Sequence, residues 1–159
     1  MYLTQFSTPW GDACIRWTES GINALFLPGI NFSREYYAIA KTDPFDAVVQ
    51  LRYYFEKKLH TFKLPLDCQG TVFQQAVWQG LQQIPYGATW SYRQLAEAIG
   101  NPGAVRAVGN ANGANPVPLI IPCHRVIRSN GTLGGYSQGI AIKQALLKLE
   151  NANPYFSNS

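Results

Sequence analysis

The chain has few of the features that would place it in a membrane or outside the cell. No run of about 18 apolar residues occurs in its 159 residues, which excludes a membrane-spanning helix by length. Its first residues, Met-Tyr-Leu-Thr-Gln, have neither the basic nor the apolar region of a secretory signal. Charged residues make up only 14% of the chain and hydrophobic residues 47%, which excludes a disordered tail and indicates a globular protein.

Cysteine is scarce and irregularly spaced. The three cysteines, Cys14, Cys68 and Cys123, form no Cys-x-x-Cys pair, so we expect neither a disulfide framework nor a zinc ribbon. His60 does not complete a set with metal-ligand spacing, and no metal site is expected. Free thiols are typical of a reducing compartment, so the expected location is the cytoplasm.

The net charge of +4 suits an anionic partner such as nucleic acid but does not identify one. The distribution of the charge is more informative than its sum. Four arginines fall within one stretch of the second half of the chain: Arg93, Arg106, Arg125 and Arg128.

The order of local patterns predicts two domains. Short β-prone runs with turn residues between them occupy residues 1–27, and a helical apolar pattern follows Asp43-Pro44 up to about residue 58. The segment 64–70 breaks this pattern. We therefore expect an N-terminal α/β domain over residues 1–66, a linker over 67–70 and a C-terminal domain over 71–159.

The second domain is expected to be mainly helical. Capping-box patterns begin helices over residues 71–85 and 91–100, and an Asn-Pro pair begins a third over 101–113. A last helix is expected over about 139–150. The second and third helices, joined by a short turn, have the layout of a helix-turn-helix.

The helix expected over 101–113 has an uncommon face. At 100° per residue, Arg106, Gly109, Asn110 and Gly113 fall on one side, opposite an apolar side that includes Asn112. Each helical glycine costs about 1 kcal/mol relative to alanine, so two on one face indicate close approach of another backbone. A nucleic-acid strand qualifies; the alternative is tight helix packing inside the protein, with Arg106 merely solvated.

Cys123 lies where a run typical of a buried strand, residues 119–121, is closed by a proline. A thiol is a nucleophile only as the thiolate, which a base or a cation promotes, and His124 and Arg125 follow directly. Neighbours in an extended chain point to opposite faces, so His124 is expected to act on the sulfur through a water, with Glu150 as a candidate orienter of the ring. The alternatives are an inert core cysteine and an ordinary surface carboxylate.

The run Pro122-Cys123-His124-Arg125-Val126-Ile127 resembles the active-site signature of the O6-alkylguanine-DNA alkyltransferases, or methylated-DNA–protein-cysteine methyltransferases. Residues 106–109, 115–118 and 135–139 also match the family in order and spacing. The resemblance covers about residues 71–150, and the preceding part fits the variable N-terminal domain in outline. It implies an α/β (α+β) protein with a small ribonuclease-H-like sheet-and-helix domain and a helical domain with a winged-helix-like helix-turn-helix.

The resemblance also implies roles for residues of the reaction. Cys123 would accept the alkyl group, activated through a water by His124 and then Glu150. Arg106 would enter the base stack in place of the extruded nucleotide. Tyr92 would help to rotate the base and donate a proton near guanine N3.

Further residues would shape the base pocket and the DNA surface. Asn115 would be a hinge between the recognition helix and the active-site loop, and Tyr136 a wall of the pocket. The backbone at Ser137 would contact O6, and the carbonyls of Cys123 and Val126 would read the exocyclic amine. A DNA-binding surface in the minor groove would comprise Ser91, Arg106, Gly109, Asn110 and Gly113.

The implied function is repair of double-stranded DNA by transfer of an alkyl group from O6-alkylguanine, and more weakly from O4-alkylthymine, to Cys123. The thioether product has no leaving thiol, so each molecule would act once. Neither a cofactor nor a membrane is expected to take part. The expected state is a monomer that could cluster along DNA. A lesion-binding relative that does not transfer the group is the alternative, but such relatives carry tryptophan where this chain has Cys123. A cysteine hydrolase is disfavoured because its histidine would lie far along the chain.

Overall fold

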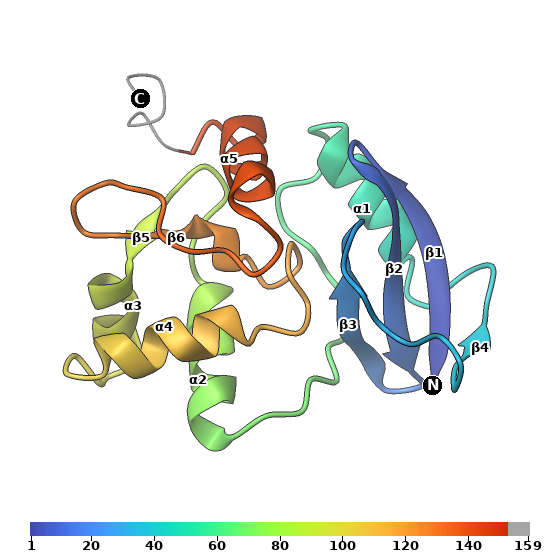
Figure 1. The fold of residues 1–159 in the computed structure, drawn as a ribbon, viewed down its shortest axis with the longest axis horizontal. Coiled ribbons are helices and arrows are strands. Elements are labelled where there is room, and N and C mark those ends of the chain that lie inside the picture. The colour runs from blue at the N-terminus through green and yellow to red at the C-terminus, as the bar shows by residue number, and fades with distance from the viewer. Residues whose placement is uncertain (153–159) are drawn as a thin grey trace. The chain divides into compact units, whose positions relative to one another are not determined.

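The computed structural model describes residues 1–152, which form two compact units, Met1–Gln69 and a second that begins at Gly70 (Figure 1). The fold is mixed α/β, as the sequence predicts. Asp67, in the expected linker, is held in the first unit, because its carboxylate accepts a hydrogen bond from Thr18 Oγ1 at 2.7 Å and its N–H donates to the Ile22 carbonyl.

The first unit contains a sheet of four strands in the order β3-β2-β1-β4. The three runs expected to be strands are strands, joined as antiparallel hairpins, and a short strand that the sequence did not indicate pairs in parallel with the first. The strands are β1 (Tyr2–Thr8), β2 (Gly11–Thr18), β3 (Gly21–Phe26) and β4 (Ala38–Ile39). Ile15 and Trp17 of β2 are buried, and the ring of Trp17 meets that of Phe45 edge to face.

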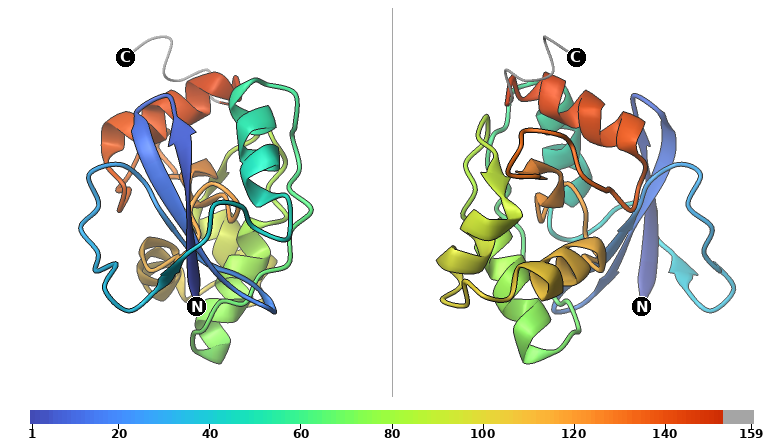
Figure 2. Two further views of the ribbon diagram at one scale, coloured as in Figure 1. Left: turned by 90° about the vertical axis from the view of Figure 1, so that its right-hand side faces the viewer. Right: turned by 60° about the vertical axis from the view of Figure 1, so that its left-hand side comes forward.

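One helix, α1 (Ala47–Phe55), lies beside this sheet in both views of Figure 2. It buries Leu51 and Tyr54, which lie three residues apart and so on one face. It begins later than expected after Asp43, because Asp46 directly before it has a positive φ of 61°, while the Asp43 carboxylate accepts the backbone N–H groups of Ala47 and Val48.

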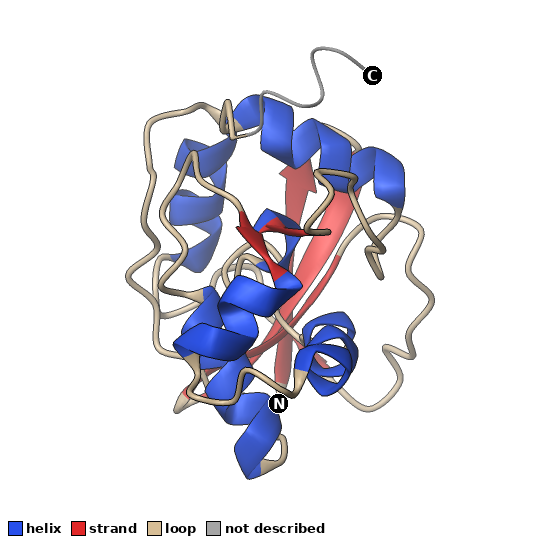
Figure 3. Ribbon diagram, turned by 90° about the vertical axis from the view of Figure 1, so that its left-hand side faces the viewer, coloured by secondary structure: helices blue, strands red, loops and turns tan. Residues whose placement is uncertain are grey.

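The second unit is mainly helical, with two short strands among its helices (Figure 3). Its helices are α2 (Val72–Leu81), α3 (Tyr92–Ala98), α4 (Val105–Gly113) and α5 (Ile140–Leu149). The strands β5 (Trp90–Ser91) and β6 (Val126–Ile127) pair in parallel. Both predicted capping boxes are confirmed, one between Thr71 and Gln74 and one between Ser91 and Gln94.

Three expectations for this unit were wrong. The third helix begins at Val105 and not at Asn101, because residues 101–104 form a separate turn closed by the Ala104 N–H on the Asn101 carbonyl. Residues 119–121 are buried but are not a strand: Leu119 has φ 74° and the Ile121 N–H bonds back to Val117. Cys123–Arg125 is a 3₁₀ turn, so the extended geometry assumed for Cys123 and His124 does not apply.

Close packing sets the position of α4. The indole N–H of Trp78, on α2, donates to the Ala111 carbonyl at 3.0 Å.

Gly80 on α2 lets α3 approach, because a Cβ there would lie 2.9 Å from a methyl of Ile99 and 3.0 Å from one of Leu95. Within this unit the Cys123–Arg125 turn lies between α4 and α5, as Figures 1 and 2 agree.

Candidate active site

The C-terminal end of α5 brings Glu150 to the turn that carries Cys123. The Nε2 atom of His124 lies 2.7 Å from Glu150 Oε2, and Arg125 Nε donates to Oε1 at 2.8 Å. Arg125 also donates through Nη2 to Oε2 and through Nη1 to the Ile84 carbonyl. His124 and Glu150 are buried, so the alternative of a surface carboxylate was wrong for Glu150.

The charges of this cluster follow from its contacts. Burial alone would raise the pKa of Glu150, but its hydrogen bonds with His124 and Arg125 and the positive charge of Arg125 lower it to about 2. Burial lowers the pKa of His124 below its usual 6.5 and outweighs the opposing effect of Glu150. At neutral pH, therefore, Glu150 is a carboxylate and His124 is a neutral imidazole.

This pairing fixes which ring nitrogen of His124 carries the proton. An ionised carboxylate can only accept, so the proton is on Nε2 and points to Glu150. The other nitrogen, Nδ1, is buried and makes no hydrogen bond within residues 1–152. Its lone pair is free to accept a proton, which is what a general base needs.

Cys123 is buried, 2% exposed, and is not a thiolate in the resting protein. Burial raises the pKa of its thiol to about 11, although Asn115, Lys143 and Tyr136 act in the opposite direction. At pH 7 the thiol form therefore predominates over the thiolate. The sulfur consequently needs a base that takes its proton during the reaction.

Asn115 ties the end of α4 to the segment before Cys123. Its Nδ2 donates to the Ile121 carbonyl at 2.8 Å, and its Oδ1 accepts the Val117 N–H at 3.0 Å. The side chain is buried, so the loss of either bond would leave a polar group without a partner at a cost of about 1–3 kcal/mol.

Lys143 is a buried cation that the sequence reasoning missed. Its Nζ donates to the carbonyls of Val126 at 2.7 Å and Gly135 at 3.0 Å, and its side chain is fully buried. Burial lowers its pKa to about 8. A signal was present, because Lys143 shares with Leu146, Leu147 and Glu150 the helical spacing that predicts a buried face.

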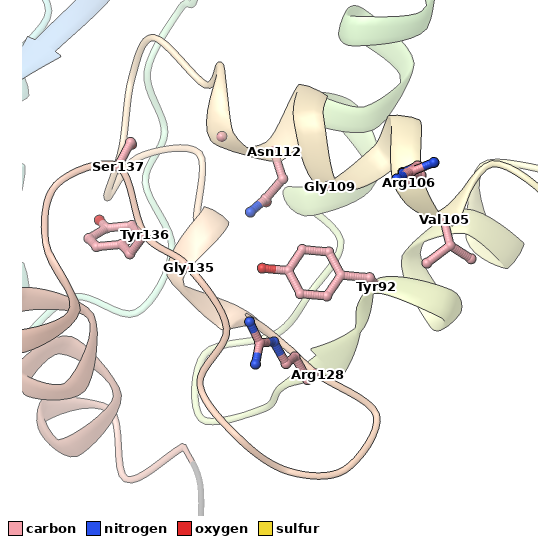
Figure 4. A pocket seen from close by; sticks show the side chains of 10 residues that line it. Tyr92, Val105, Arg106, Gly109, Asn112, Arg128, Gly135, Tyr136 and Ser137 are labelled. Carbon is pink, nitrogen blue, oxygen red and sulfur yellow. The ribbon is translucent and has the colours of Figure 1, made fainter.

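A pocket of about 480 Å³ lies between α4 and the loop that follows β6 (Figure 4). Its lining residues are Tyr92, Val105, Arg106, Gly109, Asn112, Gly113, Arg128, Gly135, Tyr136 and Ser137. Cys123 lies near this pocket, because it interacts with two of the lining residues, Tyr92 and Tyr136, whose pKa values are raised mainly by burial. The thiol and the pocket thus form one candidate site.

The small residues of α4 face this pocket and not the protein interior. A Cβ at Gly113 would meet nothing within 4 Å, and one at Gly109 would make only ordinary contact with the Tyr92 ring. Tight internal packing, the alternative reason for these glycines, is therefore not what the structure has. Arg106, on the same face, is exposed.

Most of the residues expected in the base pocket and on the DNA surface line this pocket, but Asn110, Ser91 and the fully buried Val126 do not. Asn110 is exposed on α4 and does not line the pocket. Ser91 caps α3 through the Gln94 N–H and lines a separate hollow of about 170 Å³. Arg128 lines both cavities, a position that the sequence pattern did not indicate.

Residues 1–152 contain neither a candidate metal site nor a candidate membrane span. No three His, Cys, Asp or Glu side chains within residues 1–152 gather as metal ligands would. No helix in this part of the chain has the length and apolarity needed to cross a membrane.

A buried thiol next in sequence to a buried histidine–carboxylate pair, near a pocket, is typical of proteins that use a cysteine as a nucleophile. Residues 72–152 match the family model "6-O-methylguanine DNA methyltransferase, DNA binding domain". Over 96% of its length the chain is 45% identical to a methylated-DNA–protein-cysteine methyltransferase of Methanosarcina barkeri, covering 99% of that protein. A constitutive enzyme of that name from Bacillus subtilis is 42% identical, with 94% of each chain covered.

A solved structure agrees with these sequence relatives. The crystal structure of Mycobacterium tuberculosis OGT in complex with DNA superposes with a TM-score of 0.89 at 43% identity, covering 95% of this chain and 93% of that one. The chain belongs to the methylated-DNA–protein-cysteine methyltransferase family.

Proposed function

We propose that this protein repairs alkylated DNA by moving the alkyl group from O6 of guanine to the sulfur of Cys123. The main support for this proposal is that His124 and Arg125, which follow the buried thiol in sequence, both hydrogen-bond to Glu150 near a pocket. The relatives named above are methylated-DNA–protein-cysteine methyltransferases, and the M. tuberculosis relative was crystallised with DNA.

The transfer exchanges one bond for another. Sγ of Cys123 forms a bond to the alkyl carbon while the bond from that carbon to O6 breaks, and the electron pair of the broken bond stays on guanine. The thiol proton passes through a water to Nδ1 of His124, and Glu150 stabilises the imidazolium that results. Tyr92, whose raised pKa keeps its hydroxyl protonated, donates a proton to guanine near N3.

The base would reach the sulfur by leaving the duplex. Extrusion costs a few kcal/mol, and less at a damaged base, which contributes to selectivity. In this proposal Arg106 fills the vacated position in the stack, while the face of Arg106, Gly109, Asn110 and Gly113, with Ser91, lies along the minor groove. The open space at Gly113 supports a close approach by a DNA backbone. Binding through phosphates would be salt-sensitive and nearly independent of sequence.

The pocket walls would then identify the base. Tyr136 forms one wall, the backbone at Ser137 contacts O6, and the carbonyls of Cys123 and Val126 accept the exocyclic amine. Lys143 supports this arrangement because it holds the Val126 carbonyl by a hydrogen bond. Asn115 acts as the hinge between α4 and the active-site loop, in keeping with its two buried hydrogen bonds.

In terms of domains, residues 1–66 form the N-terminal domain of this proposal and 67–70 the linker. Residues 71–159, of which 153–159 lie outside the described part, form the DNA-binding and alkyl-transfer domain. The order β3-β2-β1-β4 with α1 supports a ribonuclease-H-like fold for the first. The α3–α4 pair with the β5–β6 strands supports a winged-helix-like helix-turn-helix in the second.

The protein is consumed by its reaction, because a thioether offers no easily displaced group. We further propose weaker transfer from O4-alkylthymine, no cofactor, and a monomer that clusters along DNA at high coverage. The three free cysteines fit the cytoplasm as its location.

The test is a single-turnover reaction with duplex DNA that carries labelled O6-methylguanine, followed by digestion of the protein. One equivalent of label is expected on the Cys123 peptide, none in Cys123→Ala, and an unchanged equivalent in Cys68→Ala as the matched cysteine control. Turnover beyond one equivalent would overturn the proposal. Tight lesion binding without any label would favour the non-transferring alternative.

A further inference from the structure

Asn112 lies on the buried side of α4 and is 5% exposed, yet it lines the pocket and not the apolar core. Figure 4 shows its side chain reaching from α4 into the pocket, with the amide nitrogen turned toward the space between Tyr92 and Tyr136. Its Oδ1 is buried and has no hydrogen-bond partner within residues 1–152. No role for this residue follows from the proposed function.

An unpaired amide is an uncommon occupant of such a position. Buried polar side-chain atoms nearly always have a partner, and each exception calls for a reason. The position itself is firmly placed, because the preceding residue, Ala111, accepts the Trp78 indole N–H through its carbonyl. A leucine has the same number and branching of side-chain heavy atoms and would suit the buried wall without an unpaired group. The amide nitrogen also has no partner among the described residues, and it is the atom that faces the pocket (Figure 4), so it points to an acceptor that enters with the ligand.

We infer that Asn112 donates a hydrogen bond from its amide nitrogen to a ring nitrogen of the extruded base. The inference rests on the proposed function, which already gives partners to O6, N3 and the exocyclic amine and leaves N1 and N7. In O6-alkylguanine both are acceptors, because alkylation at O6 removes the proton from N1. Unmodified guanine carries a proton on N1, so an amide donor facing N1 would also disfavour the undamaged base.

The test compares Asn112→Leu with the wild-type full chain on duplexes that contain O6-methylguanine, its 7-deaza analogue or its 1-deaza analogue. Wild type is expected to lose about tenfold in single-turnover rate on one of the two analogues, the effect of one lost hydrogen bond. Asn112→Leu is expected to show that loss already on O6-methylguanine and no further loss on the same analogue. Asn101→Leu, the same change at an exposed turn outside the pocket, should behave as wild type.

Thermal unfolding separates this role from a structural one. Because Asn112→Leu removes a buried unpaired group, its melting temperature should equal or exceed that of wild type while its rate falls. Equal rates for variant and wild type, or the same loss on all three bases, would overturn the inference. Label on Cys123 in the wild-type reaction keeps the proposed function intact in either case.

Discussion

The Nε2 atom of His124 lies 2.7 Å from Oε2 of Glu150, across 26 positions of the sequence, with both side chains out of contact with water. The same carboxylate accepts Arg125 through two nitrogens, so it stays ionised while the imidazole stays neutral. This arrangement leaves Nδ1 as the basic nitrogen of the ring. The reactivity of the site should therefore depend on this buried cluster and on the pocket.

Glu150→Gln keeps the size of the side chain and removes its charge. An amide can present its N–H to Nε2 and stabilises an imidazolium poorly, so the rate of alkyl transfer should fall by about 100-fold or more. Single-turnover reactions with a duplex that contains O6-methylguanine, quenched at successive times, measure this rate. Glu97→Gln, the same change at an exposed site on α3, should react at the wild-type rate. An unimpaired Glu150→Gln would remove the relay from the mechanism.

Acid should destabilise the fold in two stages. The His124 pKa is lowered from 6.5, so an unfolded chain takes up a proton near pH 6.5 that the native chain does not, and the free energy of unfolding falls below that pH. The Glu150 pKa is lowered from 4.5 to about 2, so its contribution is complete above pH 4.5 and is lost as the pH falls toward 2. Urea unfolding between pH 7 and pH 3 should show a smaller fall below pH 4.5 in Glu150→Gln; equal slopes there would contradict the assignment.

Arg106→Ala should separate extrusion from chemistry. Arg106 is exposed at the pocket edge and has no part in the His124–Glu150 cluster, so its loss should slow repair in duplex DNA about tenfold or more and leave the reaction with free O6-benzylguanine nearly unchanged. Lys148→Ala removes one positive charge at an exposed site on α5 and serves as the charge control. Equal losses on both substrates would exclude a role in extrusion.

Lys143→Met keeps the length of the stem and removes the donor that joins the Val126 and Gly135 carbonyls. The Val126 carbonyl, which we propose accepts the exocyclic amine of the base, loses its support, so repair of O6-methylguanine should slow by about tenfold. The loss should be smaller on O6-methylhypoxanthine, which lacks the exocyclic amine that this carbonyl reads. Lys148→Met on the same helix is the control, and a loss that is identical on both bases would indicate a purely structural role for Lys143.

The local elements were predictable because their causes are local. The hairpins of residues 2–26 follow from short β-prone runs separated by turn residues, and the helix starts at Thr71 and Ser91 follow from side chains that bond three residues ahead. The same approach was wrong at residues 101–104 and 119–121. There a turn closed by the Ala104 N–H on the Asn101 carbonyl, and a positive φ at Leu119, replace the regular structure that residue preferences indicate.

The sequence by itself determined the family, through a signature around Cys123 and matched segments on either side of it, and it determined which residues could react. The tertiary structure decided how they are used. It buried Glu150 against His124, drew Lys143 onto two loop carbonyls and turned Asn112 into the pocket. Desolvation and the choice of partner depend on distance in space, and residues 26 positions apart come into contact only when α5 packs on the Cys123–Arg125 turn.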